Sequence, residues 1–144
     1  MKIVICGSID FTPEIKKISD LLSANGFDVD IPLTSQRIIR GEITLREFKQ
    51  EKKTKDGSSS RKIKDDVIRR YFQTINDSNA VLILNYKKKG LKNYIGGNTF
   101  LEMGFAHVLN KRIYLLNPIP NISYKDEIEA MQPVIINGDL SKIK

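Results

Sequence analysis

Hydrophobic positions along the chain fall into two patterns, one typical of strands and one typical of helices. Short runs of apolar and β-branched residues predict strands at 2–6, 80–84, 113–116 and 134–136, and alternating apolar residues predict another at 27–31. Within these, 80–84 is apolar throughout, which is typical of parallel strands buried on both faces. We therefore expect helices to cover both sides of the sheet.

The intervening segments carry apolar residues at the spacing of amphipathic helices. Thr12 is the expected cap of the first helix, and Asn25-Gly26 is its expected end. Thr44 and Glu47 match a capping box and predict another helix start. A mobile loop is expected at the serine-rich segment 55–60, and further helices are expected over about 61–75, 97–109 and 124–130.

Alternation of strands and helices favours parallel pairing with right-handed connections. The sequence therefore predicts an α/β fold, a five-stranded doubly wound parallel sheet of the Rossmann or flavodoxin type, with helices on both faces. A length of 144 residues fits one domain, 1–144, and no internal repeat divides it.

Charge and cysteine content narrow the choice of partner and compartment. The net charge of +7 comes from 24 basic and 17 acidic residues, and many basic residues gather at 49–64 and 87–89. Aromatic residues do not interleave with these lysines as a single-strand nucleic-acid groove requires, so we interpret both clusters as solvated loops. Cys6 is the sole cysteine, and no apolar run approaches the ~20 residues of a membrane span, which predicts a cytoplasmic protein.

Three segments follow predicted strands at the edge where doubly wound sheets bind ligands. The first is 7–11, after the first strand. The second is Asn85 together with Gly96-Gly97-Asn98-Thr99, where backbone N–H groups at a helix start can meet an anion. The third begins at Asn117. These segments match neither a P-loop nor the GxGxxG pattern.

Glu102 stands alone as a charge between Asn93 and Lys111, among apolar and small neighbours. A carboxylate there can attack or stabilise an electron-poor sugar carbon, and the positive end of the helix favours its ionised form. The alternative is structural, because Thr99 and Glu102 also match a capping box in which the glutamate folds back onto the cap. Spacing alone leaves both interpretations open.

Other chemistry-bearing residues give weaker signals. His107 is the sole histidine and is expected to pack or face solvent, and Cys6 is expected to be a small core residue. Ser8 and Asp10 suit ligand hydroxyls or phosphate, but both are also common in turns. The spacing of His, Cys, Asp and Glu fits no zinc site, so we predict neither a metal nor a cofactor.

The sequence resembles the nucleoside 2-deoxyribosyltransferase superfamily, which includes the 2'-deoxynucleoside 5'-phosphate N-hydrolases. The resemblance covers most of the chain: the strand and glycine turn at 3–8, the strand at 78–84, the segment 97–106 with Glu102-Met103-Gly104, and 110–113. It implies that Glu102 is a nucleophile that attacks the anomeric carbon of the deoxyribose. It also implies that Gly7, Ser8 and Asn98 border the sugar or phosphate.

The resemblance further implies a homodimer or larger homo-oligomer, in which a neighbouring subunit completes the site from the segment Glu129 to Gln132, which includes Met131. One position departs from the pattern. The hydrolases carry an aspartate where Tyr71 stands here. Tyr71 is therefore expected to take over positioning or proton donation, or the chemistry differs, or the protein does not turn over.

Together these observations predict an enzyme that cleaves or transfers at the N-glycosidic bond of a 2'-deoxynucleoside or its 5'-monophosphate. The alternative is a non-catalytic nucleotide-binding or sensor module. The predicted catalytic residues are Glu102 and Tyr71, and the predicted substrate-binding residues are Gly7, Ser8, Asp10, Phe11, Asn85, Gly96, Gly97, Asn98, Met103, Glu129 and Met131.

Overall fold

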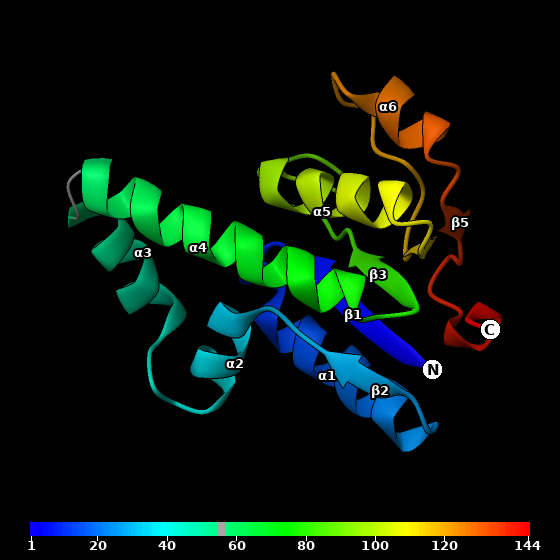
Figure 1. Ribbon diagram of the computed structural model, residues 1–144, viewed down its shortest axis with the longest axis horizontal. Helices are drawn as coiled ribbons and strands as arrows, with labels where there is room; N and C mark the ends of the chain where they lie inside the picture. Colours follow the sequence, from blue (N-terminus) through cyan, green and yellow to red (C-terminus); the bar gives the residue numbers. More distant parts are fainter. Residues whose placement is uncertain (55–56) are drawn as a thin grey trace.

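The computed structural model describes residues 1–54 and 57–144. Its centre is a parallel sheet of five strands in the order β2-β1-β3-β4-β5 (Figure 1). The strands are β1 (Lys2–Gly7), β2 (Asp28–Asp30), β3 (Ala80–Leu84), β4 (Arg112–Leu115) and β5 (Val134–Ile135). The predicted doubly wound sheet is confirmed, and each predicted strand is present within two residues of its expected bounds.

Helices cover both faces of this sheet. They are α1 (Thr12–Ala24), α2 (Leu33–Ile39), α3 (Leu45–Thr54), α4 (Gly57–Asn76), α5 (Gly97–Val108) and α6 (Lys125–Ala130), with short 3-10 turns η1 (Ile9–Phe11) and η2 (Leu140–Lys142). One core lies on the α1 side, where Ile15 and Leu22 pack on Ile3 and Leu82. The other lies under α4, α5 and α6.

The β1–β3 junction is the switch point of the sheet. β1 pairs with β2 on one side and with β3 on the other, and the connections leave on opposite faces through α1 and α4 (Figure 1). Ligands of doubly wound folds bind at the carboxyl ends of the strands at such a point. Here those ends are Gly7 and Leu84, which pair directly.

Two local predictions are wrong. Thr12 does not cap α1: it is the first residue of the helix, and its hydroxyl donates to the Ile9 carbonyl and pairs with Ser35. The segment 57–60 is the start of α4 rather than a loop, because a 20-residue amphipathic helix extends one turn beyond its apolar stripe. The rest of that expected loop, 55–56, lies outside the described residues.

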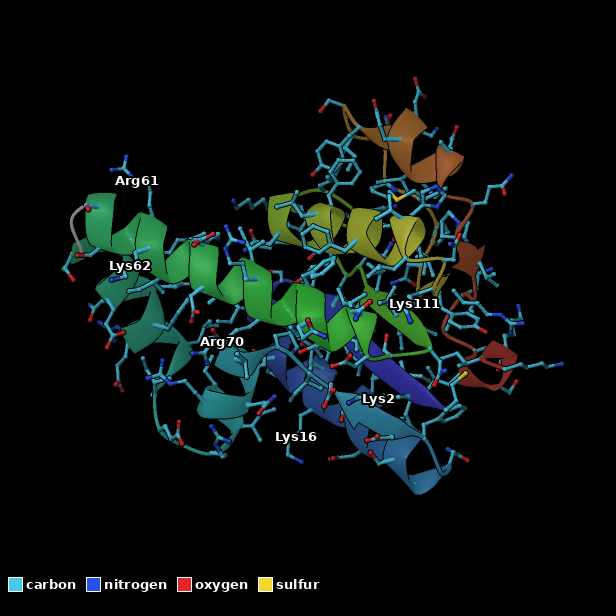
Figure 2. The ribbon with its side chains drawn as sticks, in the orientation of Figure 1. Lys2, Lys16, Arg61, Lys62, Arg70 and Lys111 are labelled. Atoms are coloured by element: carbon cyan, nitrogen blue, oxygen red, sulfur yellow. The ribbon has the colours of Figure 1, made fainter. Side chains whose placement is uncertain are left out.

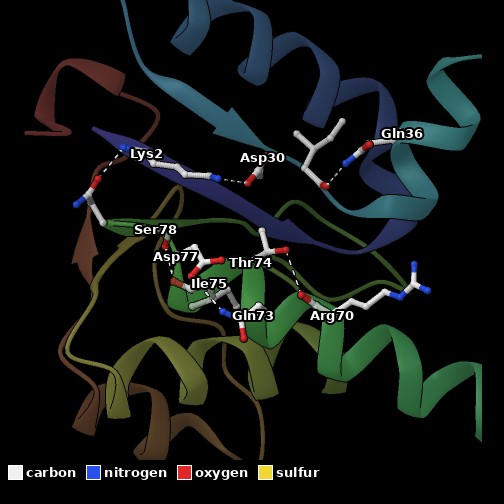
Figure 3. A network of polar contacts seen from close by, with 11 residues as sticks. Lys2, Asp30, Gln36, Arg70, Gln73, Thr74, Ile75, Asp77 and Ser78 are labelled. Atoms are coloured by element: carbon white, nitrogen blue, oxygen red, sulfur yellow. Dashed lines mark hydrogen bonds and ion pairs between the residues drawn. The ribbon is translucent and has the colours of Figure 1, made fainter.

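Helix α2 was not expected, because its seven residues are too few to show a helical repeat. It begins after Pro32, and the Gln36 side chain donates to the Ile31 carbonyl (Figure 3). The capping box at the start of α3 is confirmed, since the Thr44 hydroxyl accepts from the Glu47 N–H at 3.0 Å.

Polar contacts also join the strands near their amino ends. Lys2 pairs with Asp30 at 3.0 Å, and the Lys2 backbone N–H donates to Asn79 at 2.8 Å (Figure 3). These bonds fasten β1 to β2 and to the start of β3. None of the described helices combines the length and the apolar character that crossing a bilayer requires.

Candidate functional site

Glu102 lies one turn and a half into α5, on the side that faces α4. The helix begins at Gly97 with Gly96 as its cap, and the cap makes no side-chain hydrogen bond. Thr99 is therefore inside the helix, where it is buried. The capping-box alternative for Glu102 is wrong, because the residue that would act as the cap is already helical.

A small cavity between α4 and α5 receives the Glu102 side chain. It is lined by Val67, Ile68, Asn98, Leu101, Glu102 and Phe105. Its volume is about 20 Å³, room for about one water molecule. Val67 and Leu101 are 37% and 46% exposed, so the cavity lies directly beneath side chains at the molecular surface.

Burial controls the charge of Glu102. It raises the pKa of this carboxyl from 4.5 to about 8, although a hydrogen bond from the Cys6 thiol and the charge of Lys64 both act to lower it. The positive end of α5 is expected to favour the ionised form, but that contribution of about 0.3–1 kcal/mol is small beside the effect of burial. Burial therefore favours the protonated form of the carboxyl near neutral pH.

Tyr71, on α4, is tied to the strand that carries Cys6. Its hydroxyl donates to the Ile5 carbonyl of β1 and is buried. Burial raises the pKa of Tyr71 well above its usual range, and the charges of Cys6 and Glu102 raise it further. The Tyr71 hydroxyl therefore already donates its proton to the Ile5 carbonyl. This hydrogen bond favours a role in positioning β1 over a role as proton donor.

A second group of polar side chains meets just beyond β1. Lys88 Nζ donates to Ser8 Oγ at 2.6 Å and pairs with Asp10 at 2.8 Å. Lys49 Nζ, from α3, lies 2.5 Å from the other Asp10 oxygen. Burial raises the pKa of Asp10, but the two lysines outweigh burial and leave it below its ordinary value. We call these residues, Ser8, Asp10, Lys49 and Lys88, the Asp10 cluster.

Two predicted site glycines lie where a side chain would crowd a neighbouring group. A Cβ on Gly7 would lie 3.1 Å from the Leu84 carbonyl oxygen, where β1 and β3 end. A Cβ on Gly96 would lie 3.0 Å from the Tyr94 hydroxyl. Tyr94 also lies beneath Lys88, whose Nζ is 5.2 Å from the ring centroid. The loop between β3 and α5 therefore folds closely over the end of β1.

Other predicted binding residues have structural partners. The Asn85 amide is buried and bonds to the backbone of Asn117 and Pro118, joining the ends of β3 and β4. Met103 is fully buried in the core, and Phe11 packs edge-on against Tyr86. Their roles in binding remain predictions.

The predicted residues near α6 are not part of the Glu102 cavity. Glu129 lies at the end of that helix, where it is exposed and 3.7 Å from Lys125. Met131 caps the same helix. In Figure 1, α5 lies between α6 and α4, so these residues are on the far side of α5 from the cavity. Their predicted contribution to a neighbouring subunit stays a prediction.

Sequence reasoning missed the lysines that enter the site. Lys49, Lys64 and Lys88 belong to clusters interpreted as solvated loops, yet Lys88 is only 21% exposed. Arg61 and Lys62, by contrast, lie far out on the α3–α4 hairpin, away from the sheet (Figure 2). The position of Lys88 in the sequence could have indicated this role, because Lys88 follows β3 and the carboxyl ends of β3 and β1 lie side by side. Among the described residues, no group of His, Cys, Asp and Glu is placed to hold a metal ion.

The fold is that of a doubly wound α/β protein, and the carboxyl of the partly exposed residue Glu102 contacts Cys6 on β1, a strand of the switch point. Comparison of structures finds a match to the Clostridium botulinum CMP N-glycosidase BcmB, with a TM-score of 0.48 and 15% identity over 95% of this chain and 90% of that one. No protein-family model matches the sequence, and no curated protein matches it. The structural match is distant, and the functional argument rests on this chain's own residues.

Proposed function

We propose that the protein cleaves or transfers at the N-glycosidic bond of a 2'-deoxynucleoside or its 5'-monophosphate, with Glu102 as nucleophile. One observation carries the proposal: the Glu102 carboxyl enters a cavity between α4 and α5, next to Cys6 of β1, instead of capping its own helix. The resemblance of 97–106 to the deoxyribosyltransferase superfamily supports the same assignment. The reaction requires neither metal nor cofactor.

In the proposed first step, an oxygen of ionised Glu102 forms a bond to C1' of the deoxyribose. The C1'–N bond breaks, and its electron pair leaves with the base, which takes up a proton from solvent. The glycosyl ester on Glu102 is then opened by water, which gives the free sugar, or by a second base, which gives a new nucleoside. Both outcomes restore the carboxylate.

The surroundings of Glu102 assist this step in two ways. The Cys6 thiol and Lys64 favour the ionised, nucleophilic form against the effect of burial. Tyr71 holds β1 through the Ile5 carbonyl, so the strand that carries Cys6 stays in place beside Glu102. A cavity of about 20 Å³ is too small for a sugar, so Val67 and Leu101, both exposed, must turn outward when substrate enters.

The test is release of free base from each of the four common 2'-deoxynucleosides and their 5'-monophosphates, followed by chromatography. We expect Glu102→Gln to reduce release by on the order of 10³-fold or more. The matched control is Glu127→Gln, the same change at an exposed position of α6, which should leave release unchanged. Mass spectrometry of the stopped reaction should find the sugar attached to the peptide that contains Glu102.

Two results would refute the proposal. One is equal release by the wild type and Glu102→Gln. The other is tight binding of these compounds with no release of base at any pH between 6 and 9, which would instead establish the nucleotide-binding or sensor module.

A further inference from the structure

We infer that Lys64 gives a proton to the departing base and later accepts one from the water that releases the sugar. This inference rests on the proposed function, because it adds a second catalytic group to the Glu102 site. Lys64 lies on α4 one helical turn before Val67 and Ile68, which line the Glu102 cavity. Its place on the helix and the charges around it carry the argument.

The proposed reaction needs a proton at the leaving group. Negative charge builds on the base as the C1'–N bond breaks, and a positioned acid lowers the barrier to that step. Tyr71 is poorly suited to supply the proton, because its hydroxyl donates to the Ile5 carbonyl and burial holds its pKa well above the usual range. An acid that is already in place beside Glu102 serves this step better than bulk solvent does.

Lys64 belongs to the side of α4 that faces the protein. Ile68, Tyr71 and Ile75 follow it at intervals of four, three and four residues, which places all four side chains on one face of the helix. This face is partly or fully buried, whereas the positions on either side of Lys64 and of Ile68 are exposed. Lys64 is therefore the charged member of a stripe that leads to the Glu102 cavity.

The ammonium of Lys64 is available to a ligand. Two arginines of α4 are held by ion pairs across four residues, Asp65–Arg69 and Asp66–Arg70. The positions three and four residues from Lys64 carry no acid, and Lys64 forms no ion pair with any residue that the structure describes. Because a lysine side chain is long and flexible, this ammonium can turn into the cavity when substrate enters.

The charges around Lys64 suit it to proton transfer. Burial and the charge of Lys52, on α3, lower the pKa of Lys64, and the charge of Glu102 raises it. The net shift is downward from 10.5, so the ammonium gives up its proton more readily than an exposed lysine does. The charge of Lys64 acts on Glu102 in turn. The two groups therefore approach the cavity from its two walls, Lys64 from α4 and Glu102 from α5.

The two steps balance in protons and charge. In the first, ionised Glu102 bonds to C1', the C1'–N electron pair leaves with the base, and Lys64 Nζ gives the base a proton and becomes a neutral amine. In the second, that amine takes a proton from the attacking water, whose oxygen bonds to C1' and frees the carboxylate. When a second base accepts the sugar, the amine takes the proton which that base loses. Retaining glycosidases use a second group in the same double role.

The first test compares base release by Lys64→Met and Lys64→Arg with release by the wild type, on the nucleoside or monophosphate that is cleaved fastest. Methionine has no proton to give, so release should fall on the order of 10²-fold or more. Arginine keeps the charge but does not deprotonate, so it should not restore release. The matched control is Lys62→Met, at an exposed position of the same helix, which should leave release unchanged (Figure 2).

The pH profile of release distinguishes proton transfer from a structural role. In the wild type, release should rise as Glu102 ionises near pH 8 and fall as Lys64 loses its proton at a pH below 10.5. Burial holds the pKa values of Cys6 and Tyr71 well above their usual ranges, so neither should cause that fall. Lys64→Met should remove the fall, and Lys52→Met should move it to higher pH.

A substrate analogue with a better leaving group provides a readout that misfolding would not imitate. The base is 7-methylated if the best substrate is a purine, or 5-fluorinated if it is a pyrimidine, so that it leaves with less need of a proton. The defect of Lys64→Met should shrink by about tenfold or more on this analogue, whereas that of Glu102→Gln should persist.

Three results would overturn the inference: wild-type release by Lys64→Met, recovery of release by Lys64→Arg, or an alkaline fall that survives in Lys64→Met. Each of these leaves the proposed function intact as long as release depends on Glu102. Equal release by the wild type and Glu102→Gln would instead reject the proposed function itself, so the two failures are distinguishable.

Discussion

Glu102 and Asp10 are two carboxyl groups at the same edge of the sheet, and their surroundings shift their pKa values in opposite directions. Glu102 lies among apolar side chains of α4 and α5, with one thiol donor and one lysine charge to offset burial, and its pKa rises to about 8. Asp10 is also partly buried, but two ammonium groups lie within 2.8 Å, and its pKa falls.

The comparison shows that partners, rather than burial alone, separate the two roles. Burial disfavours the ionised form of both groups, and only close cations reverse that effect. A carboxylate that is held by two lysines is a poor nucleophile, because its charge is already satisfied. A carboxyl with few partners is costly to ionise and correspondingly reactive once it is ionised.

The largest effect we expect is a pH-dependent gain of stability in Glu102→Gln. Below pH 4.5 the glutamate is protonated in both the folded and the unfolded chain. Between pH 4.5 and about 8 the unfolded chain ionises first, so the wild type loses stability as the pH rises, and the loss is complete above pH 8. The total is on the order of a few kcal/mol, because one pKa unit corresponds to about 1.4 kcal/mol.

Urea unfolding at pH 4, 6, 7 and 9 measures this difference. The gap between Glu102→Gln and the wild type should widen across the series, while Glu127→Gln should show no such trend. A constant gap would mean that Glu102 ionises normally in the folded protein, and the contrast with Asp10 would then disappear.

Cys6 should tune the pKa of Glu102 in both directions. Cys6→Ala removes the thiol donor and should raise the pKa of Glu102, whereas Cys6→Ser supplies a stronger donor and should lower it. A hydrogen bond of about 1 kcal/mol corresponds to a change of roughly 0.5–1 pKa unit. Carbon-13 NMR titration of the glutamate side chains reads the shift directly, and the pH dependence of base release should move with it.

Opposite shifts in the two Cys6 variants are the essential result, because loss of packing alone would not separate serine from alanine in this way. If both variants titrate like the wild type, the thiol does not contact Glu102 in solution. The pKa of Glu102 would then be set by burial and the charge of Lys64 alone.

The sheet could be predicted because each strand has a local signature. β3 is apolar throughout, and a turn follows β1 at Gly7-Ser8, so their buried, parallel pairing is visible in the residue pattern. Helix α2 could not be predicted, because seven residues give no repeat and its contacts, such as the Ser35 pairing with Thr12, are tertiary. The start of α4 was missed for a similar reason, since serines at a helix start look like a loop.

The candidate site was predictable only in part. Glu102 is recognisable as an isolated charge in an apolar helix, but spacing could not decide between a cap and a cavity, because that depends on where α5 begins. The pairing of Lys49 and Lys88 with Asp10 joins residues up to 78 positions apart along the chain. No local pattern records such a contact, so these lysines looked like ordinary surface charge.

Tyr71→Phe should have a smaller effect, and it tests whether Tyr71 holds β1 in place beside Glu102. The change removes the hydrogen bond to the Ile5 carbonyl and leaves that buried acceptor unpaired, which costs on the order of 1–2 kcal/mol in the free energy of unfolding. If Tyr71 only positions β1, base release should fall less than tenfold with an unchanged pH profile. Loss of one limb of that profile would instead assign Tyr71 a proton-transfer role.

The smallest change in stability should come from Asp10→Asn, in the Asp10 cluster. Asp10 has a lowered pKa in the folded protein, so it stabilises the fold above pH 3.8, and this contribution is lost as the pH falls through the folded pKa. Lys49 is half exposed, which limits the contribution to about 0.5–1 kcal/mol. Urea unfolding should therefore show Asp10→Asn slightly less stable than the wild type at pH 7, with a smaller difference at pH 2.5. The difference at pH 7 should also shrink in 1 M salt, because salt screens exposed ion pairs. A difference that persists unchanged at pH 2.5 would show that Asp10 acts through packing rather than charge, and the two carboxyl groups would then no longer form a contrasting pair.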